Sequence, residues 1–180
     1  MGEPEQIVAL IPRLRRYARA LLGDRAAADD LVQDTLERAW LKLHLYQSGT
    51  NLRAWLFTVM HNVHVNRLRG RREEESLDES MYELVASQPA TDGLLIRDLD
   101  RAVRTLPDEQ REVLLLVVLE DMSYEQTAHT LGIPIGTVMS RLARAREAAS
   151  DSLRSGGVAA SAAREMRLAM VLSATGARRR

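Results

Sequence analysis

The stretch that decides the fold is SYEQTAHTLGIPIGTVMSRLARAR, residues 123–146. Ser123 and Gln126 have the spacing of a capping box at the start of a short helix. Gly132 supplies the positive φ that a tight turn needs. Apolar residues then recur at helical spacing, which predicts a longer helix to about Leu153. A short helix, a glycine turn and a longer helix are the elements of a DNA-reading helix-turn-helix, expected at about 124–146.

The longer helix has one apolar stripe and one polar face. The stripe consists of Val138, Leu142, Ala145 and Ala149, which we expect to be buried. The residues away from it or flanking it, which are placed to reach phosphates and base edges, are Thr137, Met139, Ser140, Arg141 and Arg144. The pattern alone leaves a plain helical hairpin with a solvated arginine face as an equal alternative.

Composition excludes several classes of protein. The chain has 180 residues, which is room for one domain or two small ones. It has no cysteine, and therefore no disulfide, no thiol nucleophile and few options for structural zinc. The N-terminus lacks a signal-peptide plan, and no apolar run is long enough to span a bilayer, so we expect a cytoplasmic protein without membrane insertion. Since no nucleophile–base set, metal cluster or phosphate loop stands out, we expect no enzymatic activity, no metal and no cofactor.

The formal net charge is zero, with 25 basic and 25 acidic residues. A uniformly basic nucleic-acid binder is therefore excluded. The charges are nevertheless segregated, because residues 1–70 carry +3, 71–100 carry −6, 101–154 carry −1 and 155–180 carry +4. Such asymmetry indicates parts with different partners, and weak DNA binding by the free chain.

All periodic segments have helical period, so the predicted fold class is all-α. Two small helical domains are expected at 7–70 and 94–153, joined by a flexible acidic linker at 71–93 and followed by an extension at 154–180. The expected helices span about 5–22, 25–45, 52–69, 94–105, 107–120, 124–131 and 136–153.

The helix expected at 25–45 begins after Asp24, which suits an N-cap. Its predicted buried stripe is Ala28, Leu31, Val32, Thr35, Ala39 and Leu43. On the next helix, core packing is preferred for Trp55 and Phe57. His61 and His64 lie one turn apart, but no third ligand completes a metal site, so solvated or phosphate-facing histidines are preferred.

Two groups of motifs carry a family resemblance. In the second domain they are LPDEQREVL at 106–114, SYEQ at 123–126 and LGIPIGTVMSRLARAR at 131–146. In the first domain they are DLVQDTLERAW at 30–40 and GTNLRAWLFT at 49–58, followed by His61 and Asn62. In this order and at this separation the chain resembles the extracytoplasmic-function sigma factors, the two-domain initiation subunits of bacterial RNA polymerase, and among them the general-stress type.

The resemblance implies three interfaces. A core-polymerase surface, facing the clamp helices of the largest subunit, would comprise Asp30, Gln33, Asp34, Glu37, Arg38 and Leu41. A −10 surface, with base-capture loop, would comprise Tyr46, Gln47, Ser48, Asn51, His61, Asn62, Asn66, Arg67 and Arg69. The −35 surface would be the five polar-face residues of the longer helix, with the flap of the second-largest subunit beside that domain.

The same resemblance implies promoter DNA and an anti-sigma factor as partners. Many family members have isoleucine at the position of Thr127 and a basic residue at that of Met139, so this chain departs from the family there. Two other functions stay open at this point. One is a sigma-like decoy that sequesters an anti-sigma factor, against which the retained Arg67, Arg141 and Arg144 count. The other is a dimeric helix-turn-helix repressor, which leaves the first domain unexplained.

Overall fold

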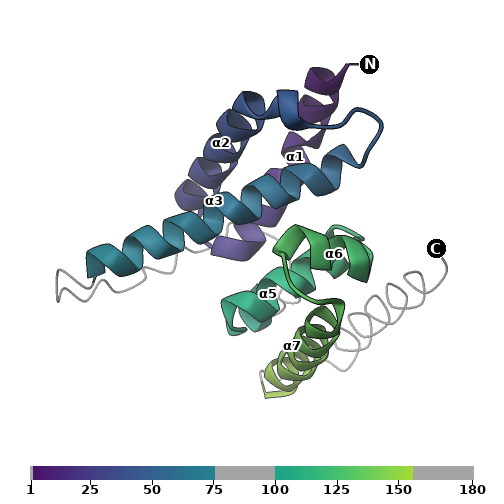
Figure 1. The fold of residues 1–180 in the computed structure, drawn as a ribbon. Coiled ribbons are helices and arrows are strands. Elements are labelled where there is room, and N and C mark those ends of the chain that lie inside the picture. Colours follow the sequence, from purple (N-terminus) through teal and green to yellow (C-terminus); the bar gives the residue numbers. More distant parts are fainter. Residues whose placement is uncertain (1, 76–99, 156–180) are drawn as a thin grey trace. The chain divides into compact units, whose positions relative to one another are not determined.

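The computed structural model describes residues 2–75 and 100–155. The chain divides into two compact units, Met1–Ser87 and Gln88–Arg180 (Figure 1). Among the described residues there are helices and turns but no strand, which confirms the all-α prediction. Most of the predicted linker and nearly all of the C-terminal extension fall outside the described residues, so the predicted domain limits stay predictions.

The described residues of unit 1 form three long helices and one short 3-10 helix. They are α1 (Glu3–Leu22), α2 (Arg25–Leu41), η1 (Leu43–Leu45) and α3 (Leu52–Glu75). Gly23 ends α1 with a left-handed φ of 74°, and the predicted cap Asp24 accepts the backbone N–H of Ala27 at 2.7 Å. This tight junction allows α2 to fold back against α1.

The core of unit 1 follows the predicted helical stripes. On α2, the first five predicted stripe residues, from Ala28 to Ala39, are buried. Leu56, Phe57 and Met60 of α3 are also buried, and the rings of Phe57 and Tyr17 form a T-shaped pair with centroids 5.1 Å apart. Helix α3 packs against both α1 and α2, and this packing fixes its position in unit 1.

Several predictions for unit 1 are wrong in detail. Helix α2 ends at Leu41 because Lys42 leaves helical geometry (ψ 6°), so Leu43 lies in η1 and is only half-buried. Helix α3 continues to Glu75, past the expected end at 69, since arginine and glutamate are good helix formers. His64 is 5% exposed and so is not solvated. Trp55 is half-buried instead of lying in the core.

Unit 2 contains the predicted helix-turn-helix. Residues 100–104 are helical, followed by α5 (Asp108–Leu114), η2 (Leu115–Leu119), α6 (Tyr124–Leu131) and α7 (Ile135–Ser155). The first part of the helix predicted at 94–105 lies outside the described residues. None of the described helices in either unit has the length and apolarity that crossing a membrane requires.

The helix expected at 107–120 does not continue uniformly. Its second half, η2, is a π-helix, and the N–H of Glu120 bonds the carbonyl of Leu115 at 3.1 Å. Arg111 ties α5 to the preceding segment by donating to the carbonyl oxygens of Val103, Arg104 and Leu106 at 3.1, 2.7 and 2.7 Å. These bonds and the buried apolar side chains of η2 fix α5 and η2 in place. Helix α7 packs against α5, and α6 packs against η2.

Candidate nucleic-acid and partner surfaces

The turn between α6 and α7 has the predicted geometry. The Ser123 hydroxyl accepts the N–H of Gln126 at 3.1 Å, and the Gln126 side chain accepts the N–H of Ser123 at 3.0 Å. Gly132 closes α6 with a φ of 63°. The predicted stripe of α7 is buried at all four positions, from Val138 to Ala149. The opposite face of α7 is thereby directed away from the core of unit 2.

The five predicted DNA contacts of α7 differ in how available they are. Met139, Ser140 and Arg144 are exposed, whereas Thr137 is half-buried, and its carbonyl accepts the Ser140 hydroxyl at 3.1 Å. The side chain of Arg141 is only 22% exposed, because it forms an ion pair with Glu109 of α5 at 2.5 Å. This pair engages Nη2 of Arg141, so Glu109 competes with a phosphate for its charge.

The loop before α3 is ordered by its own side chains. The ring of Tyr46 lies against that of Trp55 with centroids 5.4 Å apart, and its hydroxyl donates to the carbonyl of Thr50 at 2.6 Å. The Asn51 side chain caps α3 by accepting the N–H of Ala54 at 3.1 Å. Trp55 thus supports an aromatic wall of the loop, a role that sequence reasoning missed.

Ser48, at the tip of this loop, is tied to the start of α1. Its hydroxyl donates to the carboxylate of Glu3. This hydrogen bond holds the pKa of Glu3 below its ordinary value of 4.5, aided by the backbone at the helix start. Gln47 and Ser48 are both exposed, so the loop is accessible to a partner although Ser48 ties it to α1.

The polar residues of α3 form the second part of the predicted −10 surface. Asn62, Asn66 and Arg69 are exposed, and His61 is half-buried. Among the described residues, no group of three or more His, Cys, Asp or Glu side chains lies together in a way that could hold a metal ion.

The predicted core-polymerase residues lie on the outer side of α2. Asp30, Gln33, Glu37, Arg38 and Leu41 are exposed, and Leu41 is 75% exposed. The Gln33 amide donates to the carboxylate of Glu37, one turn further along the helix, at 3.1 Å. This hydrogen bond fixes the position of the Glu37 carboxylate on the acidic face. The face is therefore both charged and open to a partner.

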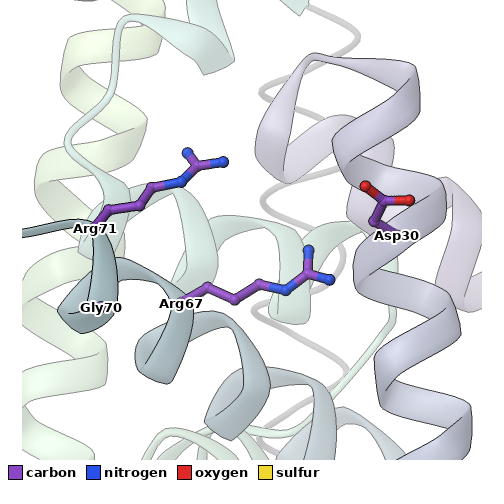
Figure 2. Close-up of a pocket in the computed structure, with 4 residues that line it drawn as sticks. All are labelled: Asp30, Arg67, Gly70 and Arg71. Atoms are coloured by element: carbon purple, nitrogen blue, oxygen red, sulfur yellow. The ribbon is translucent and has the colours of Figure 1, made fainter. Parts of the chain in front are cut away.

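Asp34, a predicted core-polymerase contact, pairs with Arg67, a predicted −10 contact. Nε and Nη2 of Arg67 donate to its Oδ2 at 3.0 and 2.5 Å, linking α2 to α3. Beside this pair lies a shallow hollow lined by Asp30, Arg67, Gly70 and Arg71, and Figure 2 shows both arginines extending from α3 toward α2. A predicted polymerase contact and a predicted DNA contact thus neutralise each other within the chain.

Three exposed apolar side chains in or beside the predicted surfaces were not predicted as contacts. Trp40 and Leu45 are 56% and 64% exposed at the end of α2 and in η1, and Ile135 is 42% exposed at the start of α7. The signal that identifies Trp40 is in the sequence, since it lies one residue after the buried Ala39, away from the stripe. Leu45 and Ile135 carry no comparable signal, because each lies where the helix boundary decides its exposure.

Comparisons with known proteins agree with this arrangement. Residues 7–61 match the model of the Sigma2 domain of PhyR, and residues 96–148 match Sigma-70 region 4. The ECF RNA polymerase sigma factor EcfG of Rhodopseudomonas palustris is 42% identical, over 83% of this chain and 83% of its own length. The ECF sigma factor SigL of Mycobacterium tuberculosis is 37% identical, over 81% of this chain and 85% of its own.

A solved structure is also similar. The sigma factor RpoE of Bartonella quintana, solved in complex with the anti-sigma factor NepR, superposes with a TM-score of 0.75 at 38% identity, covering 84% of this chain and 96% of that one. These similarities extend across both units and the helix-turn-helix between α6 and α7. The chain therefore belongs to the ECF family of sigma factors, which direct RNA polymerase to promoters.

Proposed function

We propose that this sigma factor uses three surfaces for its three tasks. The observation that carries the proposal is that most of the predicted contact residues are exposed and lie outside the buried stripes. They cluster on α2, on the loop 46–51 with α3, and on α7. Catalysis belongs to the polymerase, and this subunit supplies binding and positioning.

The outer side of α2 binds the clamp helices of the largest polymerase subunit. Asp30 and Glu37 offer carboxylates to arginines of a partner helix, which can bind them through two parallel hydrogen bonds. The exposed Trp40, Leu41 and Leu45 add apolar area beside this acidic face, and an apolar centre with a polar rim is typical of protein interfaces.

The loop 46–51 and α3 contact the −10 element. Holding a base outside the duplex needs a stacking surface and polar groups at its edge. The Tyr46–Trp55 pair supplies the surface, and Gln47 and Asn51 supply polar groups near it. Asn62, Asn66 and Arg69 continue the polar surface along α3.

Helix α7 enters the major groove of the −35 element, beside the flap of the second-largest subunit. Its exposed Ser140 and Arg144 contact phosphates and base edges, joined by Arg141 once the pair with Glu109 opens. A similar protein, the RpoE sigma factor, is complexed with an anti-sigma factor, and we propose such a regulator and a stress-response role for this chain.

Transcription with purified core polymerase tests the proposal. Transcript starts mapped after induced expression would give both promoter elements, and the holoenzyme should open these promoters. Leu41→Ala should weaken core binding, whereas Val8→Ala, which removes a comparably exposed apolar side chain from α1, should not. Failure to transcribe any mapped promoter would instead favour a decoy that only binds an anti-sigma factor.

A further inference from the structure

The first two turns of α7 carry an apolar pair on their exposed side. Ile135 is 42% exposed and Met139 is 53% exposed. Side chains four residues apart are neighbours on a helix, so the two form one continuous apolar ridge. Single exposed apolar residues are ordinary on protein surfaces, but a ridge of two large ones on a helix whose other large exposed side chains are charged is a feature to explain.

The ridge lies at the end of α7 that a helix-turn-helix directs into DNA. Ile135 is the first residue of α7, and the carbonyl of Pro134 accepts the N–H groups of Thr137 and Val138 at 2.9 and 3.2 Å. Between the two apolar residues, Gly136 presents bare backbone with no atom within 4 Å of the place where a Cβ would lie. The space beside this turn of α7 is therefore open.

The neighbours of the ridge define what can be bound there. Ser140 follows Met139 directly, and Arg144 lies one turn further along; both are exposed. These polar side chains suit phosphates and the hydrogen-bonding atoms of base edges. In the major groove the one apolar group that base edges present is the C5-methyl of thymine.

We propose that Ile135 and Met139 are specificity residues that read thymine methyl groups in the −35 element. The inference rests on the proposed function of α7, and it assigns to this chain a thymine preference at the positions under the ridge, on either strand. Arg144 and Ser140 then contribute affinity and register, while the ridge discriminates thymine from the other bases. Burying one methyl group against the ridge corresponds to about fourfold in affinity.

The experiment uses the holoenzyme and duplexes selected by it from a library randomised at the −35 element. Each thymine of the selected element is then replaced by deoxyuridine, which removes the C5-methyl and keeps the base-pairing edge. For the unaltered protein we expect about fourfold weaker binding at one or two positions. Met139→Ala and Ile135→Ala should abolish the difference between thymine and deoxyuridine. Arg144→Ala, the matched control, should weaken binding to both duplexes by the same factor.

The possible outcomes separate this inference from the proposed function. Selected elements without thymine on either strand, or binding that is unaffected by deoxyuridine, would overturn the thymine reading while specific −35 binding stands. If Met139→Ala weakened the binding of core polymerase in the absence of DNA, the ridge would be a polymerase contact and the inference would be wrong. If the holoenzyme selected no −35 sequence at all, the proposed function of α7 itself would fail.

Discussion

The ion pair between Asp34 and Arg67 should stabilise unit 1 by a small, salt-sensitive amount. At about 3 Å in water two unit charges attract by about 1.4 kcal/mol. The side chains are 48% and 32% exposed, so solvent screening and the entropy of ordering two side chains offset part of this. We therefore expect a net coupling of about 0.5–1 kcal/mol between the two residues at low salt.

A double-mutant cycle in the full chain measures this coupling. The chain's two tryptophans, Trp40 and Trp55, both lie in unit 1, so urea unfolding followed by tryptophan fluorescence reports on that unit. The cycle comprises Asp34→Ala, Arg67→Ala and the double variant, and compares their free energies of unfolding. Asp30→Ala combined with Arg67→Ala is the matched control, because Asp30 lines the same hollow but forms no ion pair seen among the described residues.

Salt provides the second half of the test. The Debye length shortens from about 10 Å at 0.1 M to about 3 Å at 1 M salt, so the coupling should fall toward zero in 1 M salt. A coupling near zero at low salt would show that the pair does not form in solution. A coupling that is unchanged in 1 M salt, or equally large in the Asp30 control, would refute the electrostatic explanation.

Three other predictions concern single side chains. The hydroxyl of Thr127 is buried and has no hydrogen-bond partner within the described part of unit 2, so Thr127→Val should stabilise this unit by about 1 kcal/mol, measured by amide exchange in α6. Unchanged or faster exchange would contradict this. Gly132→Ala places a side chain on a backbone with a φ of 63° and should lower the free energy of unfolding by about 1–2 kcal/mol, measured by amide exchange in α6. The control Gly136→Ala, in helical backbone with open space around it, should not lower it. Ser48→Ala should raise the pKa of Glu3 toward 4.5 in an NMR titration. Because this pKa is lowered in the folded chain, the tie stabilises above pH 4.5 and is lost as the pH falls through the folded value; a pKa unchanged by the substitution would refute the hydrogen bond.

Features that depend on local sequence could be predicted. The buried stripe of α7, the capping box at Ser123 and the turn at Gly132 each follow from residues within a few positions of one another. Helix periodicity and capping act over one or two turns, so a short stretch of sequence is enough to predict the cap, the turn and the buried stripe. The exposed faces that bear the predicted contacts follow from the same periodicity.

Features that depend on how helices pack could not be predicted. The register of α2 against α3 brings Asp34 to Arg67, 33 positions further along the chain, and no sequence spacing encodes it. The same packing buries His64, and the fold of the loop draws Trp55 toward Tyr46 and out of the core. The π-helical η2 likewise replaces a uniform helix without a local signal such as proline or glycine.

Two of the ion pairs bear on how this chain of zero net charge binds DNA. Arg67 pairs with Asp34 of α2, and Arg141 pairs with Glu109 of α5, so two predicted DNA contacts are held by acids of neighbouring helices. A phosphate contact that replaces such a pair loses up to about 1 kcal/mol. The free chain should therefore bind promoter DNA weakly. In the holoenzyme a polymerase cation bound to Asp34 would leave Arg67 available, so that docking of α2 and binding of DNA by α3 would strengthen one another.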